Sequence, residues 1–180
     1  SVSKNVIHSV SNTSSAGVMV TGIYYSGAAT GSNVIAGNLV HSLAVTSNSA
    51  SSGLRGIDLG YGAFIVQNNM VRLGLNAAGT NTGGAAGVYG MVDNISVNGR
   101  NFFHNTVLVS GTQTSGGIAT TAFVSLGTGN IRSFKNNIFA NIRSNGGGSG
   151  FHYSVRYSGS GVNPAGLTAG NNLFFVNNGA

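Results

Sequence analysis

Short runs of apolar residues alternate along the whole chain with stretches rich in Gly, Ser, Thr and Asn. Glycine and β-branched residues interrupt every segment that could otherwise follow a helical period. Short apolar runs bounded by turn-forming residues are typical of β-strands. The pattern therefore predicts short strands separated by turns and disfavours a helical repeat.

Two motifs recur in phase. In the first, an asparagine precedes two apolar residues, and the intervals between successive copies are 33, 31, 36, 32 and 35 residues. The second begins in most copies with a glycine and lies about midway between the asparagines. The first motif starts at Asn5, Asn38, Asn69, Asn137 and Asn172, with a degenerate copy at Asn105. The second reads Gly22-Ile23-Tyr24-Tyr25, Gly56-Ile57-Asp58-Leu59 and Gly87-Val88-Tyr89-Gly90, with weaker copies Thr121-Ala122-Phe123-Val124 and Ser154-Val155-Arg156-Tyr157.

Several short strands in each repeat can bury their apolar faces only by stacking on the same strands of the next repeat. We therefore predict an all-β fold, a right-handed parallel β-helix (β-solenoid) of about five coils of 31–36 residues. Because the sequence begins and ends inside the repeat, we expect residues 1–180 to form a single β-helix domain within a longer repeat-containing chain.

In such a fold, equivalent residues lie about 4.8 Å apart along the axis and form columns. We expect a structural asparagine ladder, which a second row formed by Asn68, Asn136 and Asn171 extends, because asparagine tolerates the left-handed conformation of tight corners. The ladder consists of Asn5, Asn38, Asn69, Asn105, Asn137 and Asn172. One apolar column contains Val6, Leu39, Met70, Ile138 and Leu173, and another contains Ile23, Ile57, Val88 and Val155.

The composition narrows the classes of partner. Hydrophobic residues make up 41% of the chain and charged residues only 6%. The net charge is +6, but the basic residues are scattered, so we expect no nucleic-acid partner. There is no cysteine, which excludes disulfides and thiolate metal sites. No apolar stretch is long enough to insert into a membrane as a helix.

Candidate catalytic groups are few. Asp58 and Asp93 are the only carboxylate side chains and fall at different positions of the repeat, so a facing acid–base pair is not expected. His8 and His41 should stack in adjacent coils with Arg72 in the next, which makes a polar edge and lacks a third metal ligand. We therefore predict no catalytic residue, no metal site and no cofactor, and we do not expect this segment to be an enzyme.

One outward column offers a candidate binding face. Alternation along the strand places Tyr24 outside if Ile23 and Tyr25 point inward. The equivalent residues, Asp58, Tyr89, Phe123 and Arg156, would complete a shallow glycan-binding face, since aromatic rings stack on sugars and charged groups bond to hydroxyls. In the alternative interpretation, loops such as residues 76–87 cover this column and the aromatic residues belong to the core.

Two regions resemble a known family. The first is residues 136–145, followed by Phe151-His152-Tyr153 and then Asn163-Pro164-Ala165-Gly166-Leu167. The second is residues 20–25, followed by Asn38-Leu39-Val40-His41-Ser42. They resemble the pectate-lyase-like β-helix regions of very large Bacteroidetes surface proteins that the type IX secretion system exports. The resemblance extends over essentially the whole chain. It implies an extracellular or cell-surface location and the right-handed coil, but no particular reaction.

Together these observations favour a noncatalytic structural or adhesive β-solenoid module of a secreted or cell-surface bacterial protein. Its expected partners are neighbouring β-helix repeats, or copies of itself associating end to end through exposed strand edges. The alternative is a carbohydrate-binding or lyase-like polysaccharide-degrading module. A third interpretation, ice binding, is disfavoured because the threonine pairs Thr80/Thr82 and Thr112/Thr114 are not repeated in register.

Overall fold

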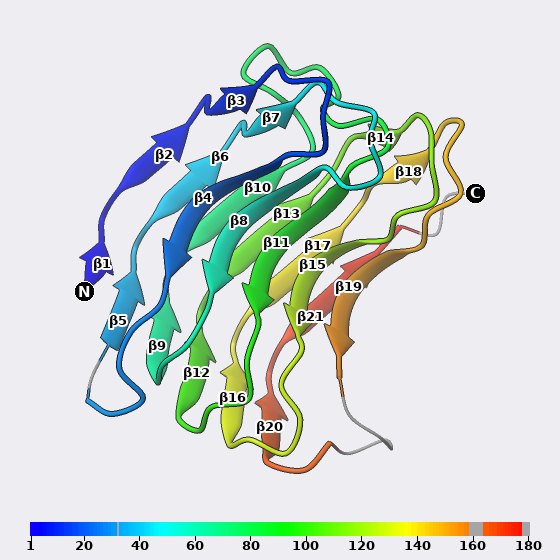
Figure 1. Cartoon of the computed structure of the whole chain (residues 1–180). Helices are drawn as coiled ribbons and strands as arrows, with labels where there is room; N and C mark the ends of the chain where they lie inside the picture. The colour runs from blue at the N-terminus through cyan, green and yellow to red at the C-terminus, as the bar shows by residue number, and fades with distance from the viewer. Residues whose placement is uncertain (32, 159–163, 178–180) are drawn as a thin grey trace.

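The computed structural model describes residues 1–31, 33–158 and 164–177, and these form a parallel β-solenoid of about five turns, which confirms the predicted fold (Figure 1). Three long parallel sheets line the axis. The first contains β1 (Val2–Ser3), β5 (Asn33–Ala36), β9 (Phe64–Gln67), β12 (Arg100–Phe103), β16 (Arg132–Lys135) and β20 (Leu167–Gly170). The second contains β2 (Val6–His8), β6 (Leu39–His41), β10 (Met70–Leu73), β13 (Thr106–Val109), β17 (Ile138–Asn141) and β21 (Leu173–Val176). The third contains β4 (Met19–Tyr25), β8 (Gly53–Leu59), β11 (Gly87–Asp93), β15 (Thr120–Ser125) and β19 (His152–Tyr157).

Two short parallel pairs extend one corner of the solenoid, β3 (Ser11–Asn12) with β7 (Ala44–Val45) and β14 (Thr112–Gln113) with β18 (Ser144–Asn145). The chain runs along the first and second sheets, crosses over, and returns along the third sheet, which faces the viewer in Figure 1. In the part of the chain that the structure describes, no helix is long and apolar enough to cross a membrane.

The asparagine ladder is present and continuous from Asn5 to Asn172. In each link, the backbone N–H and the Nδ2 group of one asparagine both donate to Oδ1 of the next, at 2.9–3.1 Å. From Asn38 onward, Nδ2 also donates to a backbone carbonyl of the preceding coil, as Asn69 does to Ile35 at 2.9 Å. Every side-chain donor and acceptor of the buried inner asparagines is therefore satisfied, which is what makes their burial tolerable.

The prediction that a second row of asparagines extends the ladder is wrong. Asn68, Asn136 and Asn171 are exposed, and no hydrogen bond joins their side chains. They instead adopt left-handed backbone conformations, with φ between 53° and 57°, as the prediction for the corner required. The same corner is left-handed at Lys4, Gly37 and His104, so this position demands a backbone shape and tolerates several side chains.

One expected apolar column lies outside the core. Val6, Leu39, Met70, Ile138 and Leu173 do stack in register on the second sheet, but they point outward, and Val6 is 62% exposed. The ladder asparagine points into the corner, so alternation sends the next residue out and the following one in. The inward column is therefore the next one along the chain: Ile7, Val40, Val71, Val107, Phe139 and Phe174.

A column of small residues lets the third sheet approach the second. An added Cβ on Gly56 would lie 2.4 Å from Val71 Cγ1 and 2.5 Å from the carbonyl oxygen of Gly90, so no larger side chain fits there without movement. Gly22 and Gly90 meet the same obstruction from Val40 and Val107. This position of the repeat is therefore fixed by close packing between the sheets.

The remaining interior is mostly apolar, and among its buried arginines Arg100 pairs with a carboxylate whereas Arg132 and Arg143 donate to carbonyl and amide oxygens. In the later coils Phe102, Phe123 and Phe134 pack with ring centroids 4.8–5.0 Å apart. At the corner between the third and first sheets, fully buried Arg100 donates to Asp93, which also accepts a 2.7 Å hydrogen bond from Ser125. A buried ion pair of this kind is retained only because both partners are fully hydrogen-bonded.

Alanine substitutions at two adjacent asparagines, Asn69 in the ladder and Asn68 outside it, test the contribution of the ladder to stability. Asn69→Ala removes four buried hydrogen bonds and leaves the N–H of Asn38 without its acceptor, so we expect a loss of about 3 kcal/mol or more in unfolding free energy. Asn68→Ala changes only an exposed left-handed residue and should cost about 1 kcal/mol. Denaturant unfolding of both variants measures the difference, and equal losses would contradict the structural role of the ladder.

Candidate binding groove

The outer face of the third sheet carries most of the residues predicted to bind glycans. The pairing of β4, β8, β11, β15 and β19 defines two outward columns on this face. One contains Thr21, Arg55, Tyr89, Thr121 and Tyr153. The other contains Tyr24, Asp58, Val92, Val124 and Arg156.

The predicted five-residue column is only partly formed. Tyr24, Asp58 and Arg156 do share a column, but Tyr89 belongs to the other outward column, and Phe123 is fully buried in the core. The reason is a slip in aligning the second motif. The structure pairs Gly87 with Gly53 and Phe123 with Met91, whereas the sequence comparison had matched Gly87 with Gly56 and Phe123 with Tyr89. Relative to β8, the predicted alignment of β11 is three residues out, so Tyr89 lies beside Arg55 and not beside Asp58. The predicted alignment of β15 is one residue out, so Phe123 lies in the inward column of Ile57, which explains its burial.

The observed register also changes the membership of the second predicted core column. Ile23, Ile57 and Val155 do lie in one inward column, but its other members are Met91 and Phe123. Val88 is also buried, one column away, where it pairs with Leu54. The four residues predicted for this second column are therefore in the core or packed against it, and for them the error concerns register alone.

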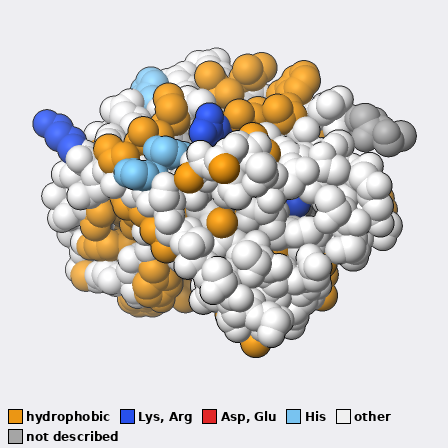
Figure 2. All heavy atoms as spheres, turned by 90° about the horizontal axis from the view of Figure 1, so that it is seen from above, with side chains coloured by type: hydrophobic (Ala, Val, Ile, Leu, Met, Phe, Trp, Pro, Cys, Tyr) orange, Lys and Arg blue, Asp and Glu red, His pale blue; other side chains and the backbone are white. Residues whose placement is uncertain are grey.

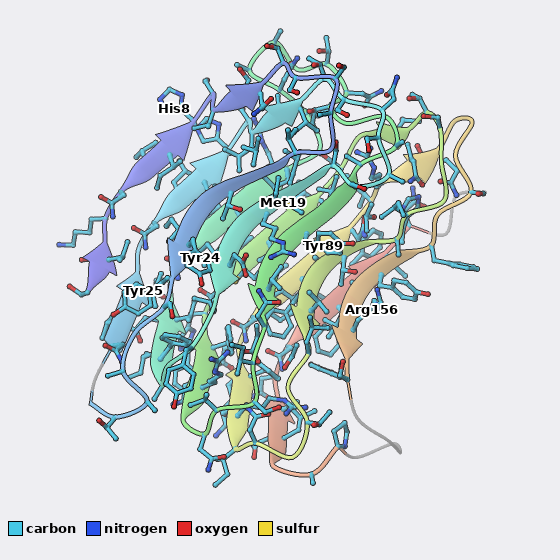
Figure 3. All side chains as sticks on the ribbon, viewed as in Figure 1. His8, Met19, Tyr24, Tyr25, Tyr89 and Arg156 are labelled. Carbon is cyan, nitrogen blue, oxygen red and sulfur yellow. The ribbon has the colours of Figure 1, made fainter. Side chains whose placement is uncertain are left out.

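A groove of about 250 Å³ lies on this outer face. Its polar lining includes Arg55, Tyr89 and Arg156, with Asn94 beside them, and Met19 and Leu126 are among its apolar walls. Met19, Tyr89 and Arg156 come from β4, β11 and β19 and are labelled across the face of the sheet in Figure 3. We refer to this feature as the outer groove. Tyr24 and Asp58 do not line it.

The charges around the outer groove are unequal. Arg55 Nη1 lies 2.6 Å from Asp58 Oδ2, and Asn94 Nδ2 donates to the other carboxylate oxygen at 2.5 Å. Asp58 is only 4% exposed, so its carboxylate is committed to these two donors. Arg156 is exposed and lies 5.2 Å from the ring centroid of Tyr153, without a carboxylate partner. The groove therefore presents a net positive charge beside an aromatic ring.

The two carboxylates lie on opposite faces of the third sheet, Asp58 outside and Asp93 inside. The paired residues Arg55 and Arg100 neutralise them separately. A hydrolytic acid–base pair needs two carboxylates that face one substrate, and these two side chains do not have that arrangement.

The histidine arrangement is as expected. The rings of His8 and His41 stack with centroids 5.2 Å apart and planes 7° from parallel, and Arg72 pairs with His41 in the next coil. Each histidine Nδ1 lies about 3 Å from the hydroxyl of the following serine, Ser9 or Ser42. Among the described residues, no group of three or more His, Cys, Asp or Glu side chains could hold a metal ion.

Sequence reasoning missed several features of this surface. Arg55, Met19 and Asn94 were not proposed for the outer groove, because they flank the motif that was aligned, and only the correct register brings them together. The outward apolar column of the second sheet, which the sequence predicts as core, is also part of the exposed surface. Figure 2 shows hydrophobic side chains mixed with histidine and basic side chains on one face, with no acidic side chain in view.

Comparisons with known proteins give no relative: no protein family, no curated protein and no solved structure matches the chain. The class of protein defined by the coordinates is a parallel β-solenoid with an asparagine ladder. The resemblance to Bacteroidetes surface proteins stays a prediction.

The histidine stack predicts a pH dependence of stability. Desolvation, followed by the positive charges of His8 and Arg72, lowers the pKa of His41 below its ordinary value of 6.5. A histidine with a depressed pKa stabilises the fold above its unfolded-state pKa, and that contribution is lost as the pH falls through the folded-state pKa. We expect the melting temperature to fall between about pH 7.5 and pH 5, and to fall less in His41→Asn.

The pKa of His152 is also lowered, by burial and then by Arg143, so the wild-type response is not due to His41 alone. Because His152 is present in both proteins, the difference between their pH-dependent changes in melting temperature measures the contribution of His41 alone. His104→Asn is the matched control, since His104 is an exposed residue at a left-handed corner that asparagine also suits. The same pH response in wild type and His41→Asn would contradict the prediction.

Proposed function

We propose that this chain is a noncatalytic structural module, a rigid β-solenoid that spaces or displays other parts of a bacterial surface or extracellular protein. The observation that carries the proposal is the unbroken asparagine ladder, which links every coil from Asn5 to Asn172. A repeat protein in which each coil is bonded only to its neighbours resists bending when every neighbour contact is satisfied. Association with further solenoid coils, in an adhesive or fibrous assembly, belongs to the same proposal.

The secreted or cell-surface location, and export by the type IX secretion system, rest on the resemblance described above. The sparse charge and the many Gly, Ser, Thr and Asn residues are consistent with an extracellular repeat. A calcium site usually draws on several carboxylates, and hydrolytic acid–base catalysis needs two that face one substrate, whereas the two carboxylate side chains of this chain lie on opposite faces of the third sheet.

The spacer function predicts a fixed end-to-end distance. Val6 and Leu173 lie in one outward column and are both more than half exposed, so cysteines introduced there can carry spin labels in a chain that has no native cysteine. Five strand spacings separate these positions, which gives a backbone separation of about 24 Å. We expect pulsed electron-paramagnetic-resonance measurements on Val6→Cys/Leu173→Cys to give one narrow distance distribution near this value.

The matched control uses Met70→Cys with Leu173→Cys, in the same column but only three spacings apart, which should give about 14 Å. A broad distribution in both variants would mean that the coils move independently, and the spacer proposal would then fail.

A second function, binding a polysaccharide, is supported by the outer groove. Tyr89, Arg55 and Arg156 lie on a concave surface, and aromatic rings with nearby guanidinium groups suit sugar faces, hydroxyls and acidic substituents. The half-buried Tyr89 ring is the most suitable stacking surface, because neighbouring side chains already restrict it. This function is compatible with a structural role, since both use the rigidity of the same sheet.

Two tyrosines test the outer groove. We expect Tyr89→Ala to weaken binding to any recognised polysaccharide by about tenfold, the loss of one aromatic contact. Tyr24→Ala should leave binding unchanged, because the exposed Tyr24 does not line the groove. Affinity electrophoresis through gels containing neutral or uronic-acid polysaccharides measures both. Absence of retardation in every gel, or equal effects of the two substitutions, would exclude the groove as a glycan site.

A further inference from the structure

The two end coils expose complementary halves of the ladder. At one end, Asn5 Oδ1 accepts no hydrogen bond from any described residue. At the other end, Asn172 Nδ2 donates once, to the carbonyl of Phe134, and its backbone N–H donates to no described residue. In every inner link, the backbone N–H and the Nδ2 group of one asparagine both donate to Oδ1 of the asparagine in the next coil. One end of the solenoid therefore offers donors and the other an acceptor.

We propose that the chain binds a second copy of itself head to tail, in a single register in which Asn172 of one copy donates to Asn5 of the next. This inference rests on the proposed structural function and specifies its partner. It concerns the edges that the described residues form, and a further coil of the same repeat would satisfy the same donors and acceptors.

The register follows from the repeat itself. Each inner asparagine donates through Nδ2 to a carbonyl three residues before the ladder asparagine of the preceding coil, as Asn69 does to Ile35. Continuing the pattern, Asn172 donates through both its N–H and its Nδ2 group to Oδ1 of Asn5 in the next copy. The Nδ2 group of that Asn5 then donates to the carbonyl of Ala169. The junction repeats the hydrogen bonds of an inner link.

The same register pairs exposed apolar side chains on the second sheet. Leu173, 57% exposed, meets Val6 of the next copy, itself 62% exposed, and Phe174, 47% exposed, meets its inward-facing Ile7. Phe174 already stacks on Phe139 with planes 5° from parallel, so the new contact continues the core. Such contacts remove from water the apolar surface that the two end coils expose.

One further aromatic pair forms in the same register. Phe175, 51% exposed, meets His8 of the next copy and so extends the stack that His8 forms with His41. Within the described residues, the third sheet has five strands against six in the second, so this register leaves β19 and the next copy's β4 two strand spacings, about 10 Å, apart. These contacts place no two charges of the same sign in register.

Polarity excludes the other arrangements. Two Asn172 ends brought together would oppose donors with donors, and two Asn5 ends would oppose acceptors with acceptors. Either arrangement would also make the strands antiparallel, whereas every pairing between named strands in the solenoid is parallel. Head-to-tail association is heterologous and does not close by symmetry, so it extends into filaments.

Site-specific cross-linking tests the register. In Val6→Cys/Leu173→Cys, the junction places the two cysteines of neighbouring copies on adjacent strands, so a short bis-maleimide reagent should produce a ladder of covalent multimers. Met70→Cys/Leu173→Cys has equally exposed thiols in the same column, but places Met70 away from the junction. We expect about tenfold more multimer from the first variant, because adjacent thiols have millimolar effective concentrations.

Sedimentation velocity of the wild-type chain should show assembly that increases with concentration, and Phe174→Lys, which places a charge at the open end of the core, should abolish it. Tyr61→Lys, at an exposed aromatic residue outside all strands, should not. Equal cross-linking of both cysteine pairs would show side-by-side association and overturn the register. A wild-type chain that stays monomeric would overturn the inference, while a narrow intramolecular distance would still support the spacer.

Discussion

The structure depends on a hydrogen-bonded amide repeated once in every coil. Each inner ladder asparagine is buried, and burial of an amide is favourable only when its donors and acceptors are all used. The neighbouring coils are the only groups that can satisfy it, since each asparagine bonds to the coil before and the coil after. The ladder thus fixes the axial register of the first and second sheets. A coil that slipped by one residue would leave at least two buried polar groups unpaired.

The sequence predicted the repeat and the ladder, but it placed two sets of residues wrongly: the column that directly follows the ladder, which points outward, and part of the third sheet. The repeat length, the strand-and-turn architecture and the ladder members all follow from one recognisable residue, asparagine, at a corner that tolerates few alternatives. The third sheet has no such marker. Its register is set by close packing at Gly22, Gly56 and Gly90, and Gly87, three residues earlier, imitates that position in the sequence. The candidate site lies on this sheet. Gly87 accounts for the misplacement of Tyr89, and the copy around Phe123, which has no glycine to mark its register, accounts for the other error.

The net charge could be predicted from the sequence, but the positions and partners of the charged side chains could not. Two carboxylates in 180 residues indicate a basic molecule, yet the sequence alone does not show that each carboxylate is held by its own arginine. With Asp58 and Asp93 both almost fully buried, the described surface carries basic side chains with no exposed acidic ones. Long-range fields from such a surface favour anionic partners, and exposed cations such as Arg156 and Arg72 determine where those fields are strongest.

Solenoid geometry also explains how one sheet can support both a spacer and a binding surface. The outer groove gathers residues from separate coils, and Arg55, Tyr89 and Arg156 come together only because their strands stack at a constant spacing. Loops at the coil corners can change in length without moving these side chains, as the intervals of 31 to 36 residues already demonstrate. A substitution that weakens the ladder should therefore disturb the groove and the coil-to-coil contacts together, whereas a substitution in the groove should leave the ladder intact. Rigidity is the shared physical requirement of the two proposed functions, which differ only in which face of the same stack they use.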